Sequence, residues 1–592
     1  MKCGIEIHQR LDTGKLFCRC PSSLCEGEEP DLRVKRNLRA SKSEVGEIDR
    51  AAFLEQEKLL DFEYEFFNKC CCLVELDEEP PHDINPDALK LALGICQQLN
   101  MHVVDEAHVM RKIIVDGSNV SGFQRTCLLA IGGHIETSEG KVGIGTIAIE
   151  EESAGILDGE EGVKRYRLDR LGIPLIELAT EPDIKSPEHC REVAEKIGMI
   201  LRATGKAARG LGTIRQDINV SIPEGARVEI KGVQDLKSIP LIVETEVKRQ
   251  EALVLLLGKL KGVKPEENPK EADLTKVFAQ TSSALIRRGI GAGHSIMGML
   301  LKGNAGLLAT ELQPGRRYGT ELSDYAKTAG VKGIIHSDED LSKYKIGTAE
   351  ADAVRKSLGA KEDDAFVLVV APEGTARMAL ARVATRAVMR EVPGETRKAN
   401  QDGTTSYMRP LPGRARMYPE TDIPVLELGE SLLEDSRKYT GEGLEAKEEK
   451  LASLLNPQMA KRMLKSRNLG VFEELVEMGV EPMLAASTLE DTLVALRRGG
   501  VEISDIRGTM EELFSYYLKG SFAKSAIIEI LPALMQGKKV PEILDERQLH
   551  KISGGELAKL LEEHKGNMGE LMRNYRLRVD AKEVQELLAK RV

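Results

Sequence analysis

The chain has 592 residues, which is too long for one hydrophobic core and predicts several domains. Its 41% hydrophobic and 30% charged residues are typical of a globular protein, and no stretch approaches the roughly 20 apolar residues that a membrane-spanning helix needs. The net charge of −11 excludes a surface that coats nucleic acid throughout, although it is compatible with a local basic face. Because the N-terminus also lacks the zones of a signal peptide, we expect a cytoplasmic protein without membrane segments.

The first 265 residues predict a strand-rich domain. Short β-like runs recur at 3–8, 142–150, 214–222 and 227–230. Helices interrupt these runs, because Asn85 with Pro86, and Ser186 with Pro187, are cap signals that place a helix after each pair. A further helix at 240–259 ends the domain.

Three changes of pattern follow. Residues 263–273 carry two prolines and alternating charge, which indicates a linker. Residues 273–395 combine helical runs at 322–329 and 349–358 with apolar strands at 331–336 and 365–371. The segment 397–430 is rich in Pro, Gly, Arg and Tyr, as a plain or a functional loop would be, and 431–592 is almost wholly helical in pattern. The sequence therefore predicts a multidomain α+β protein with an all-α C-terminal part.

A carboxylate and an imidazole share one face of the first predicted strand. In the run GIEIH at 4–8, the two-residue period of a strand places Glu6 and His8 together and the isoleucines on the other side. Such a pair suits a divalent metal ion or acid–base chemistry. The alternative is the solvent-facing side of an edge strand.

Further carboxylates belong to two later strands. Glu150, Glu151 and Glu152 are consecutive at a strand end, where like charges are costly unless a cation neutralises them. Glu177 lies within the apolar run PLIEL, so a carboxylate buried there needs a partner or a metal ion. The alternatives are a solvated acidic turn for the first group and an ion pair with Arg170 for Glu177.

A polar strand face offers groups for a polyphosphate or for metal-bound water. Arg215, Asp217 and Asn219 alternate onto one side of the run at 214–222, and Lys231 follows in the next strand. The alternative is the outward polar face of a half-buried strand. No Walker-type phosphate-binding loop occurs, which excludes that kind of ATP site.

Ten cysteines are present, and most of them fall into two clusters. The clusters are Cys18, Cys20 and Cys25, and Cys70, Cys71 and Cys72. The pair Cys18 and Cys20 would be half of a zinc site if a C-x-x-C pair followed nearby, and none does. We therefore expect free thiols rather than a zinc site.

In this order, the motifs resemble one family, that of the B subunits of tRNA-dependent amidotransferases and their archaeal relatives, the E subunits. The matching segments are GIEIHQRLDTGKLFC, LVELDEEPPHDINPDAL, IEEESAG, DRLGIPLIELATEPDIKSP, IRQDINVSI, VEIKGVQDL and ARMYPETDIPVL. The block at 273–395, through GTELSDYAKTAGVKGII, resembles the insertion domain of bacterial-type aspartyl-tRNA synthetases, which places the chain nearer the archaeal E subunits. The resemblance implies a cradle-type catalytic domain at 1–265 and 397–430, an inserted α+β domain at 273–395, and all-α helical and tail domains at 431–592.

The resemblance implies an enzyme, a glutamyl-tRNA(Gln) amidotransferase that uses ATP and Mg²⁺. A chain of this kind would phosphorylate the side chain of glutamate esterified to tRNA(Gln). Ammonia from an asparaginase-like D subunit would then displace the phosphate and give glutaminyl-tRNA(Gln). The implied assembly is a dimer of heterodimers. The alternative is a non-catalytic scaffold that binds tRNA while its partner does the chemistry.

The resemblance also assigns roles to residues. The implied metal-binding and catalytic groups are Glu6, His8, Glu151 and Glu177, with Glu150 as the alternative to Glu151 because the acidic run leaves the register open. The implied groups for ATP or its metal ion are Arg215, Asp217, Asn219 and Lys231. The implied tRNA contacts are Arg497, Arg498, Arg573, Arg576 and Arg578. For each basic cluster, the alternative is a solvated helix face.

Overall fold

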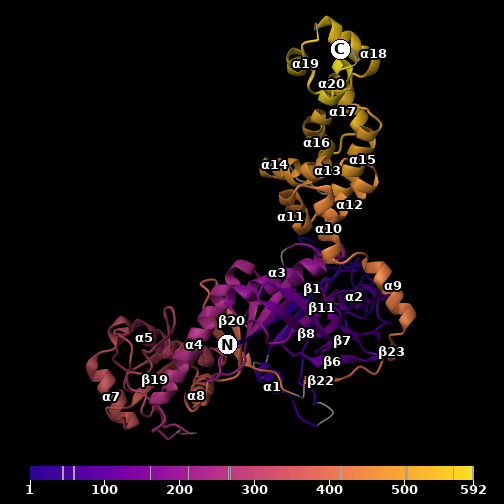
Figure 1. The fold of residues 1–592 in the computed structure, drawn as a ribbon. Helices are drawn as coiled ribbons and strands as arrows, with labels where there is room; N and C mark the ends of the chain where they lie inside the picture. Colours follow the sequence, from indigo (N-terminus) through magenta and orange to yellow (C-terminus); the bar gives the residue numbers. More distant parts are fainter. Residues whose placement is uncertain are drawn as a thin grey trace. The chain divides into compact units, whose positions relative to one another are not determined.

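The computed structural model describes residues 1–589 except 43–45, 58–59, 161, 211, 265, 267, 414–415, 501–504 and 565. The chain divides into two compact units, Met1–Gly441 and Glu442–Val592 (Figure 1). The first unit contains a large sheet with helices, and the second is helical, so the predicted α+β class with a helical C-terminal part is confirmed. The first unit reaches past residue 430 because α9 (Glu430–Thr440) packs on α2 (Pro86–Gln98).

An eleven-stranded sheet forms the centre of the first unit. Its strand order is β21 (Thr405–Pro410), β20 (Glu395–Ala399), β13 (Val228–Val233), β12 (Ile214–Ser221), β1 (Lys2–Arg10), β11 (Pro174–Thr180), β8 (Gly140–Glu151), β7 (Phe123–Thr137), β6 (Val109–Ile113) and β22 (Met417–Pro419), with β4 (His102–Val103) beside β7. Neighbouring strands are antiparallel, but β13 and β20 are parallel. The strand β20 follows the inserted region and pairs with β13, which precedes it, so both ends of the insertion are fixed to this sheet.

One face of the sheet is apolar and is covered by helices. In β1, Cys3, Ile5 and Ile7 are buried, and Cys3 Sγ lies 3.8 Å from Cys190 Sγ of α3 (Pro187–Ala203). The helix α2 packs on β7 and β8, and α4 (Ile239–Lys259) packs on β12. Because side chains alternate along a strand, Glu6 and His8 point to the opposite face.

The helices α2 and α3 begin at the caps that the sequence predicts. The Asn85 side chain accepts hydrogen bonds from the backbone N–H groups of Asp87 and Ala88, and the Ser186 hydroxyl accepts one from His189. A proline occupies the first turn of each helix, where no hydrogen bond is lost.

A small second sheet packs beside the first. Its order is β2 (Leu32–Arg36), β3 (Asp61–Phe66), β10 (Val163–Arg167) and β9 (Gly155–Glu160), and the short helix α1 (Arg50–Gln56) precedes β3. Its core contains Phe62, Tyr64, Phe67 and Tyr166, together with buried cysteines. The strands β10 and β3 are parallel although their residues are far apart in the chain.

The inserted region has its own sheet, with a hydrophobic core on each face. The sheet order is β14 (Glu271–Asp273), β15 (Ser295–Leu301), β19 (Ala365–Ala371) and β18 (Ile335–His336), and a hairpin is formed by β16 (Glu311–Gln313) and β17 (Arg316–Arg317). Its helices are α5 (Ala284–Gly291), α6 (Tyr318–Lys327), α7 (Thr348–Leu358) and α8 (Glu373–Ala387). The predicted strand at 365–371 and the helix at 349–358 are confirmed, whereas only the end of the run at 331–336 is extended.

A buried network of charges joins the inserted region to the main sheet. Its members are Arg249, Arg386, Arg397, Glu246, Glu321 and Glu395. Arg249 of α4 donates to Glu321 of α6 at 2.8 Å, and Arg397 of β20 donates to the same carboxylate at 3.3 Å. Every member is at most 3% exposed, and the three positive charges balance the three negative ones.

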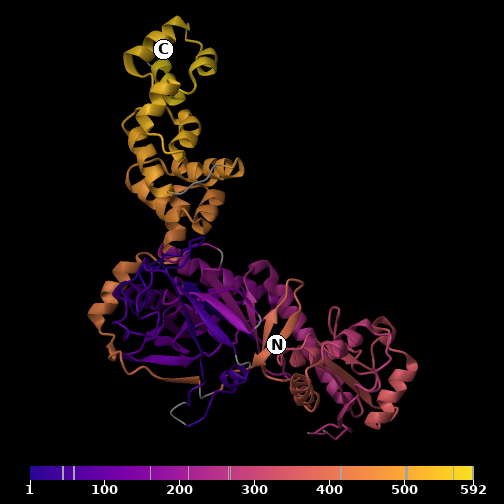
Figure 2. The ribbon, with the colours of Figure 1, turned by 180° about the vertical axis from the view of Figure 1, so that it is seen from behind.

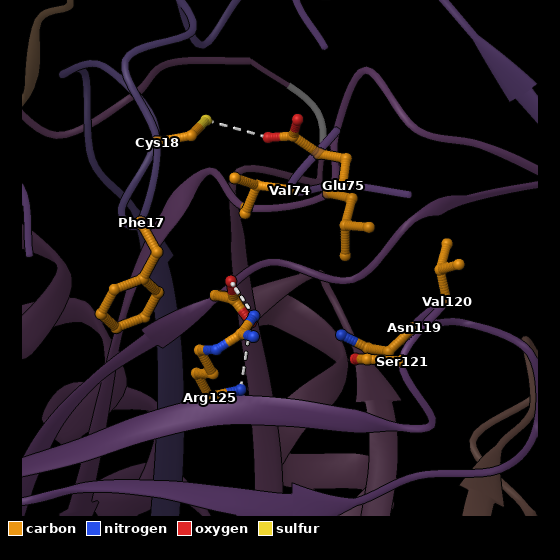
Figure 3. A pocket seen from close by; sticks show the side chains of 11 residues that line it. Phe17, Cys18, Val74, Glu75, Asn119, Val120, Ser121 and Arg125 are labelled. Atoms are coloured by element: carbon orange, nitrogen blue, oxygen red, sulfur yellow. Dashed lines mark hydrogen bonds and ion pairs between the residues drawn. The ribbon is translucent and has the colours of Figure 1, made fainter. Parts of the chain in front are cut away.

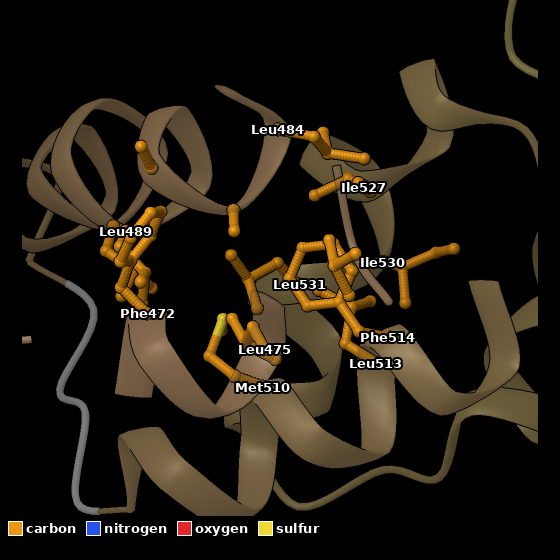
Figure 4. Packing of buried hydrophobic residues seen from close by; sticks show 14 of the residues in the cluster. Phe472, Leu475, Leu484, Leu489, Met510, Leu513, Phe514, Ile527, Ile530 and Leu531 are labelled. Atoms are coloured by element: carbon orange, nitrogen blue, oxygen red, sulfur yellow. The ribbon is translucent and has the colours of Figure 1, made fainter. Parts of the chain in front are cut away.

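The second unit is built from short helices around one main core. These are α10 (Leu444–Leu454), α11 (Pro457–Lys465), α12 (Leu469–Glu477), α13 (Pro482–Ser487), α14 (Leu493–Arg498), α15 (Ile506–Leu518), α16 (Ile527–Met535) and α17 (Val540–Arg547). Phe472, Leu475, Met510 and Phe514 meet in this core (Figure 4). The helices α18 (Gly554–Glu563), α19 (Met568–Tyr575) and α20 (Ala581–Ala589) surround a smaller core (Figure 2). In the part of the chain that the structure describes, no helix is long and apolar enough to cross a membrane.

Candidate functional site

Strand pairing brings distant carboxylates together on the open face of the main sheet. His8 of β1 lies opposite Glu177 of β11 on one side and opposite Arg215 of β12 on the other. Glu6, two residues earlier, lies opposite Asp217. Because residues directly opposite one another point to the same face, these five side chains share one surface.

The predicted ligands Glu6, His8 and Glu177 meet in this surface. One ligand atom from each lies within 4.8 Å of the other two, a spacing that a single metal ion could bridge. Glu6, Asp217 and Glu229 form a second such group, which shares Glu6 with the first. The arrangement therefore offers oxygen and nitrogen ligands for one or two divalent ions.

Glu150 also belongs to this cluster, and a lysine forms ion pairs with two of its carboxylates. His8 Nε2 lies 3.8 Å from Glu150 Oε1 and 3.9 Å from Glu177 Oε2. Lys112 Nζ donates to Glu150 at 2.7 Å and to Glu177 at 2.8 Å. Lys112 of β6 was not predicted from the sequence. The ion-pair partner of Glu177 is thus Lys112 rather than Arg170.

Crowding of like charges shifts the titration of the cluster. Burial and the neighbouring Glu177 raise the pKa of Glu6 to about 9, and the same two causes raise the pKa of Glu150 to about 8. Burial would also raise the pKa of Glu177, but Lys112 and hydrogen bonds from the other two carboxyls hold it well below its usual value. Burial lowers the pKa of His8, which keeps its imidazole neutral and able to bind a metal ion.

The structure corrects the placement of Glu151, which was predicted as a ligand in preference to Glu150. Glu151 lies on the opposite face of β8. Its carboxylate accepts a hydrogen bond from the Arg125 backbone N–H at 3.1 Å and forms an ion pair with the Arg125 guanidinium at 3.4 Å. Arg125 also binds Glu420 at 2.8 Å. The alternation of a strand separates consecutive residues, so only one of the two could reach the cluster.

Glu152 is surrounded by arginines and does not belong to the acidic cluster. Arg215 donates to it at 2.7 Å, and Arg10 and Arg170 approach it to 3.7 and 4.0 Å. Three guanidinium groups around one carboxylate leave excess positive charge beside the acidic cluster. Burial and this mutual repulsion lower the pKa of Arg10.

The groups assigned to nucleotide binding share the same face, but three of them, Arg215, Asp217 and Lys231, are already paired. Lys231 forms ion pairs with Asp217 and, at 2.6 Å, with Glu229. Arg215 is held by Glu152. Asn219 lies opposite Gly4 and is half-buried. All four assigned residues therefore lie beside the acidic cluster, within reach of a ligand that binds there.

A group of thiols forms a second possible metal centre. Ligand atoms of Cys18, Cys20, Cys72 and Glu75 all lie within 4.8 Å of one another, and Cys18 Sγ donates to Glu75 at 3.0 Å (Figure 3). Buried Lys15 pairs with Glu75 at 3.2 Å. The expectation of free thiols rested on the missing second C-x-x-C pair, whereas C-x-x-E stands there and a carboxylate is also a zinc ligand.

The basic residues assigned to tRNA lie in the second unit. Arg498 ends α14 and is exposed, and Arg573 and Arg576 are exposed at α19. Arg497 is half-buried, and Arg578 donates to the His550 carbonyl at 3.1 Å. Three of the five guanidinium groups are therefore open to solvent.

Comparisons with known proteins agree on one family. A model of the GatB/GatE catalytic domain matches residues 1–434. The E subunit of the glutamyl-tRNA(Gln) amidotransferase of Methanocaldococcus jannaschii is 45% identical, over 100% of this chain and 98% of the relative. The E subunits of Archaeoglobus fulgidus (45% identical, 100% and 97% covered) and Pyrococcus furiosus (47% identical, 95% and 90% covered) are similar to a comparable degree.

Proposed function

This chain belongs to the GatB/GatE family, and from that premise we propose that it is the glutamate-activating, tRNA-binding subunit of a glutamyl-tRNA(Gln) amidotransferase. It phosphorylates the side chain of glutamate on misacylated tRNA(Gln) with ATP and transfers ammonia that an asparaginase-like partner releases. The two subunits assemble as a dimer of heterodimers. The observation that carries the proposal is the convergence of Glu6, His8 and Glu177 from separate strands on one face.

The cluster fits a hard divalent cation such as Mg²⁺. The ion would be held by Glu6, His8 and Glu177, with Glu150 beside His8 as a further carboxylate, so the set is three carboxylates and a neutral imidazole. The raised pKa values of Glu6 and Glu150 mean that protons occupy these carboxyls when no cation offsets their charge. When bound, Mg²⁺ offsets the charge of the phosphate groups of ATP.

The proposed reaction has two steps. A side-chain carboxylate oxygen of the esterified glutamate attacks the γ-phosphorus of ATP, ADP leaves, and an acyl phosphate forms. Ammonia then attacks the carbonyl carbon, phosphate leaves, and the nitrogen loses one proton to give the amide. Arg215 and Lys231 lie on the same face as the cluster and suit contacts with phosphate oxygens.

Phosphate transfer in a single turnover tests this function. The purified complex is mixed with radiolabelled ATP, glutamate-charged tRNA(Gln) and Mg²⁺, and the acyl phosphate is trapped. Replacing Glu177 by Gln removes one ligand charge without changing shape, so we expect a loss of about a thousandfold or more in the rate. The control Glu136→Gln lies exposed on β7 and should keep the wild-type rate.

The scaffold alternative makes the opposite prediction. If the chain only binds tRNA, Glu177→Gln forms the amide at the normal rate, and EDTA has no effect on phosphate transfer beyond its effect on ATP. A normal rate of acyl phosphate formation in Glu177→Gln therefore excludes the assigned role of Glu177.

A further inference from the structure

A cavity of about 460 Å³ lies between the main sheet and the inserted region. Its walls come from β6, α1 and β21 on one side and from α6 and α8 on the other. Ile113, which follows the cluster residue Lys112 directly, is part of the lining. The cavity volume lies within the range of about 300–1,000 Å³ that is usual for small-molecule sites.

The walls suit a flat, partly apolar ligand. Ile113, Met389 and Met408 contribute apolar surface, and Tyr407 lies beside them. The Tyr407 ring is stacked on Tyr325 with 3.6 Å between ring centroids, and the Tyr325 hydroxyl donates to buried Glu395. These contacts hold the Tyr407 ring in one orientation in the cavity wall, so a ligand ring can stack on it at little entropic cost.

Most charged groups in the lining already have partners. Asp49 caps α1 and also accepts a hydrogen bond from Gly413 N at 3.0 Å. Lys164 pairs with Glu55 at 3.3 Å, and Arg382 pairs with Glu57 at 2.5 Å. These groups therefore contribute little net charge for a ligand.

Two arginines of the lining differ from the rest. Among the described residues, no carboxylate lies within ion-pair distance of Arg409 or Arg416, and Arg409 Nε is buried without a hydrogen-bond partner. Burial lowers the pKa of Arg416, and the neighbouring Arg409 lowers it further. Unpaired, partly buried guanidinium groups of this kind require an anion.

These arginines lie on the side of the cavity that adjoins the acidic cluster. Arg416 is close enough to Glu177 and Glu229 for their charges to oppose the lowering of its pKa. Against the effect of burial, Lys231 lowers the pKa of Glu229, and Arg409 lowers it further. A ligand in the cavity would therefore meet apolar and aromatic walls first, then two arginines, and then the carboxylates assigned to Mg²⁺.

We propose that this cavity binds the adenosine moiety of a substrate, with Arg409 and Arg416 contacting its phosphate. The proposal rests on the proposed function, which supplies two adenosines joined to phosphate. One belongs to ATP, and the other is the 3′-terminal nucleoside of the charged tRNA. The inserted region would then contribute part of the substrate site through α6 and α8, in addition to any contact with the body of the RNA.

A substitution that fills the cavity tests the proposal away from the acidic cluster. Thr385 of α8 is exposed, lines the cavity and hydrogen-bonds only to its own helix in the described structure, so Thr385→Trp should fold normally. Met378→Trp is the matched control, because Met378 is 40% exposed on the same helix and outside the lining. Thermal melts of both variants in complex with the partner check folding.

The kinetic readout separates the two adenosines. With Thr385→Trp, we expect KM to rise about tenfold or more for one substrate and to stay unchanged for the other, while Met378→Trp keeps both values. A rise for ATP, with weaker binding of a non-hydrolysable ATP analogue in calorimetry, identifies the ATP adenosine. A rise for charged tRNA alone identifies the terminal adenosine of the RNA. Unchanged KM values for both substrates overturn the proposal.

A second variant tests the arginines independently. Arg409→Gln should weaken binding of the phosphate-bearing probe about tenfold, either the ATP analogue or charged tRNA, and should leave binding of free adenosine unchanged. If Arg409→Gln binds the phosphate-bearing probe as tightly as the wild type does, Arg409 does not contact the phosphate, and that part of the proposal is wrong. If the wild-type complex transfers no phosphate from ATP, the proposed function itself is wrong. If the wild type is active and Thr385→Trp has unchanged KM values, only the assignment of the cavity is wrong.

Discussion

The buried network between α4, α6 and β20 and the acidic cluster on the main sheet are built from the same kinds of residues, but they differ in charge balance. In the network, three arginines face three glutamates, and the pKa of Glu321 is held well below its usual value by Arg397, Arg249 and Arg386, against the effect of burial. In the cluster, carboxylates outnumber cations, and Glu6 has its pKa raised to about 9. The comparison teaches that a balance of buried charges indicates a structural role, whereas uncompensated charge indicates a missing ligand.

Breaking the balanced network should have the largest effect on stability. Arg249→Met leaves buried Glu246 without its main partner and removes one of the three arginines around Glu321, so the free energy of unfolding of the first unit should fall by about 3–5 kcal/mol. Urea denaturation of the variant measures this loss. Lys248→Met is the control, because this neighbour is exposed and its change should stay within about 0.5 kcal/mol. An equally small effect of Arg249→Met would show that the network is not structural.

The unbalanced cluster should respond to pH and metal in a way that the network does not. A carboxyl whose folded-state pKa is raised stabilises the fold below its unfolded pKa and loses that contribution as pH rises through the folded value. Without metal, the first unit should therefore lose on the order of 2 kcal/mol between about pH 6 and pH 9, and Mg²⁺ should restore stability most at the higher pH. Melting curves in EDTA and in Mg²⁺ measure both effects.

Glu150→Gln provides the matched test of that pH dependence. Because Glu150 has its pKa raised to about 8, its neutral substitute should flatten the loss of stability in EDTA and weaken the Mg²⁺ effect. Glu136→Gln, at an exposed position, should leave the wild-type profile intact. If Glu150→Gln has the same dependence of stability on pH as the wild type, Glu150 is not a cause of that dependence.

The thiol group is an intermediate case, because Lys15 offsets Glu75 and leaves three uncharged thiols around them. The four ligand atoms fit the ligand set of zinc, so we expect about one zinc ion per chain in elemental analysis. Cys72→Ser should abolish it and lower stability by about 1–2 kcal/mol, since the small sheet keeps its own aromatic core. If the wild type contains no zinc and these thiols react freely with thiol reagents, the prediction of free thiols from the sequence is correct.

Exposed arginines should show the smallest effect, because water and salt already screen them. Replacing Arg573 and Arg576 together by Ala should weaken tRNA binding by about three- to tenfold and reduce its salt dependence by about one to two counterions. The rate of phosphate transfer at saturating tRNA should not change. The double variant Arg287→Ala and Arg288→Ala, exposed on α5 of the first unit, serves as the control. An unchanged tRNA affinity would assign the α19 arginines to an ordinary solvated surface.

Much of the site could be predicted from local periodicity. The two-residue period placed Glu6 with His8, and an acidic residue inside the apolar run of β11 marked Glu177 as a residue that needs a partner. The choice between Glu150 and Glu151 could not be made in this way, because it depends on the pairing of β8 with β11 and β7. Only the register of those strands decides which carboxylate faces His8.

Long-range partners were beyond the sequence for a similar reason. Nothing near Lys112 in the chain indicates that it bridges Glu150 and Glu177, because these three residues come from different strands. Glu75 takes the place of a second cysteine in a C-x-x-E run, so a search for paired cysteines alone could not indicate it. The extension of the first unit to Gly441 depends on Thr440 fitting against Gly94, a contact between helices far apart in the sequence.

The pairing of β20 with β13 has a consequence for how the protein is made. The ribosome translates β20, which carries Arg397, and β21, which carries Arg409, only after the whole inserted region. A nascent chain that stops earlier therefore lacks the sheet edge beside Glu229 and Lys231. A ribosome must therefore deliver about two thirds of the polypeptide before this edge can form, and premature termination anywhere in the insertion would yield a product without a finished pocket.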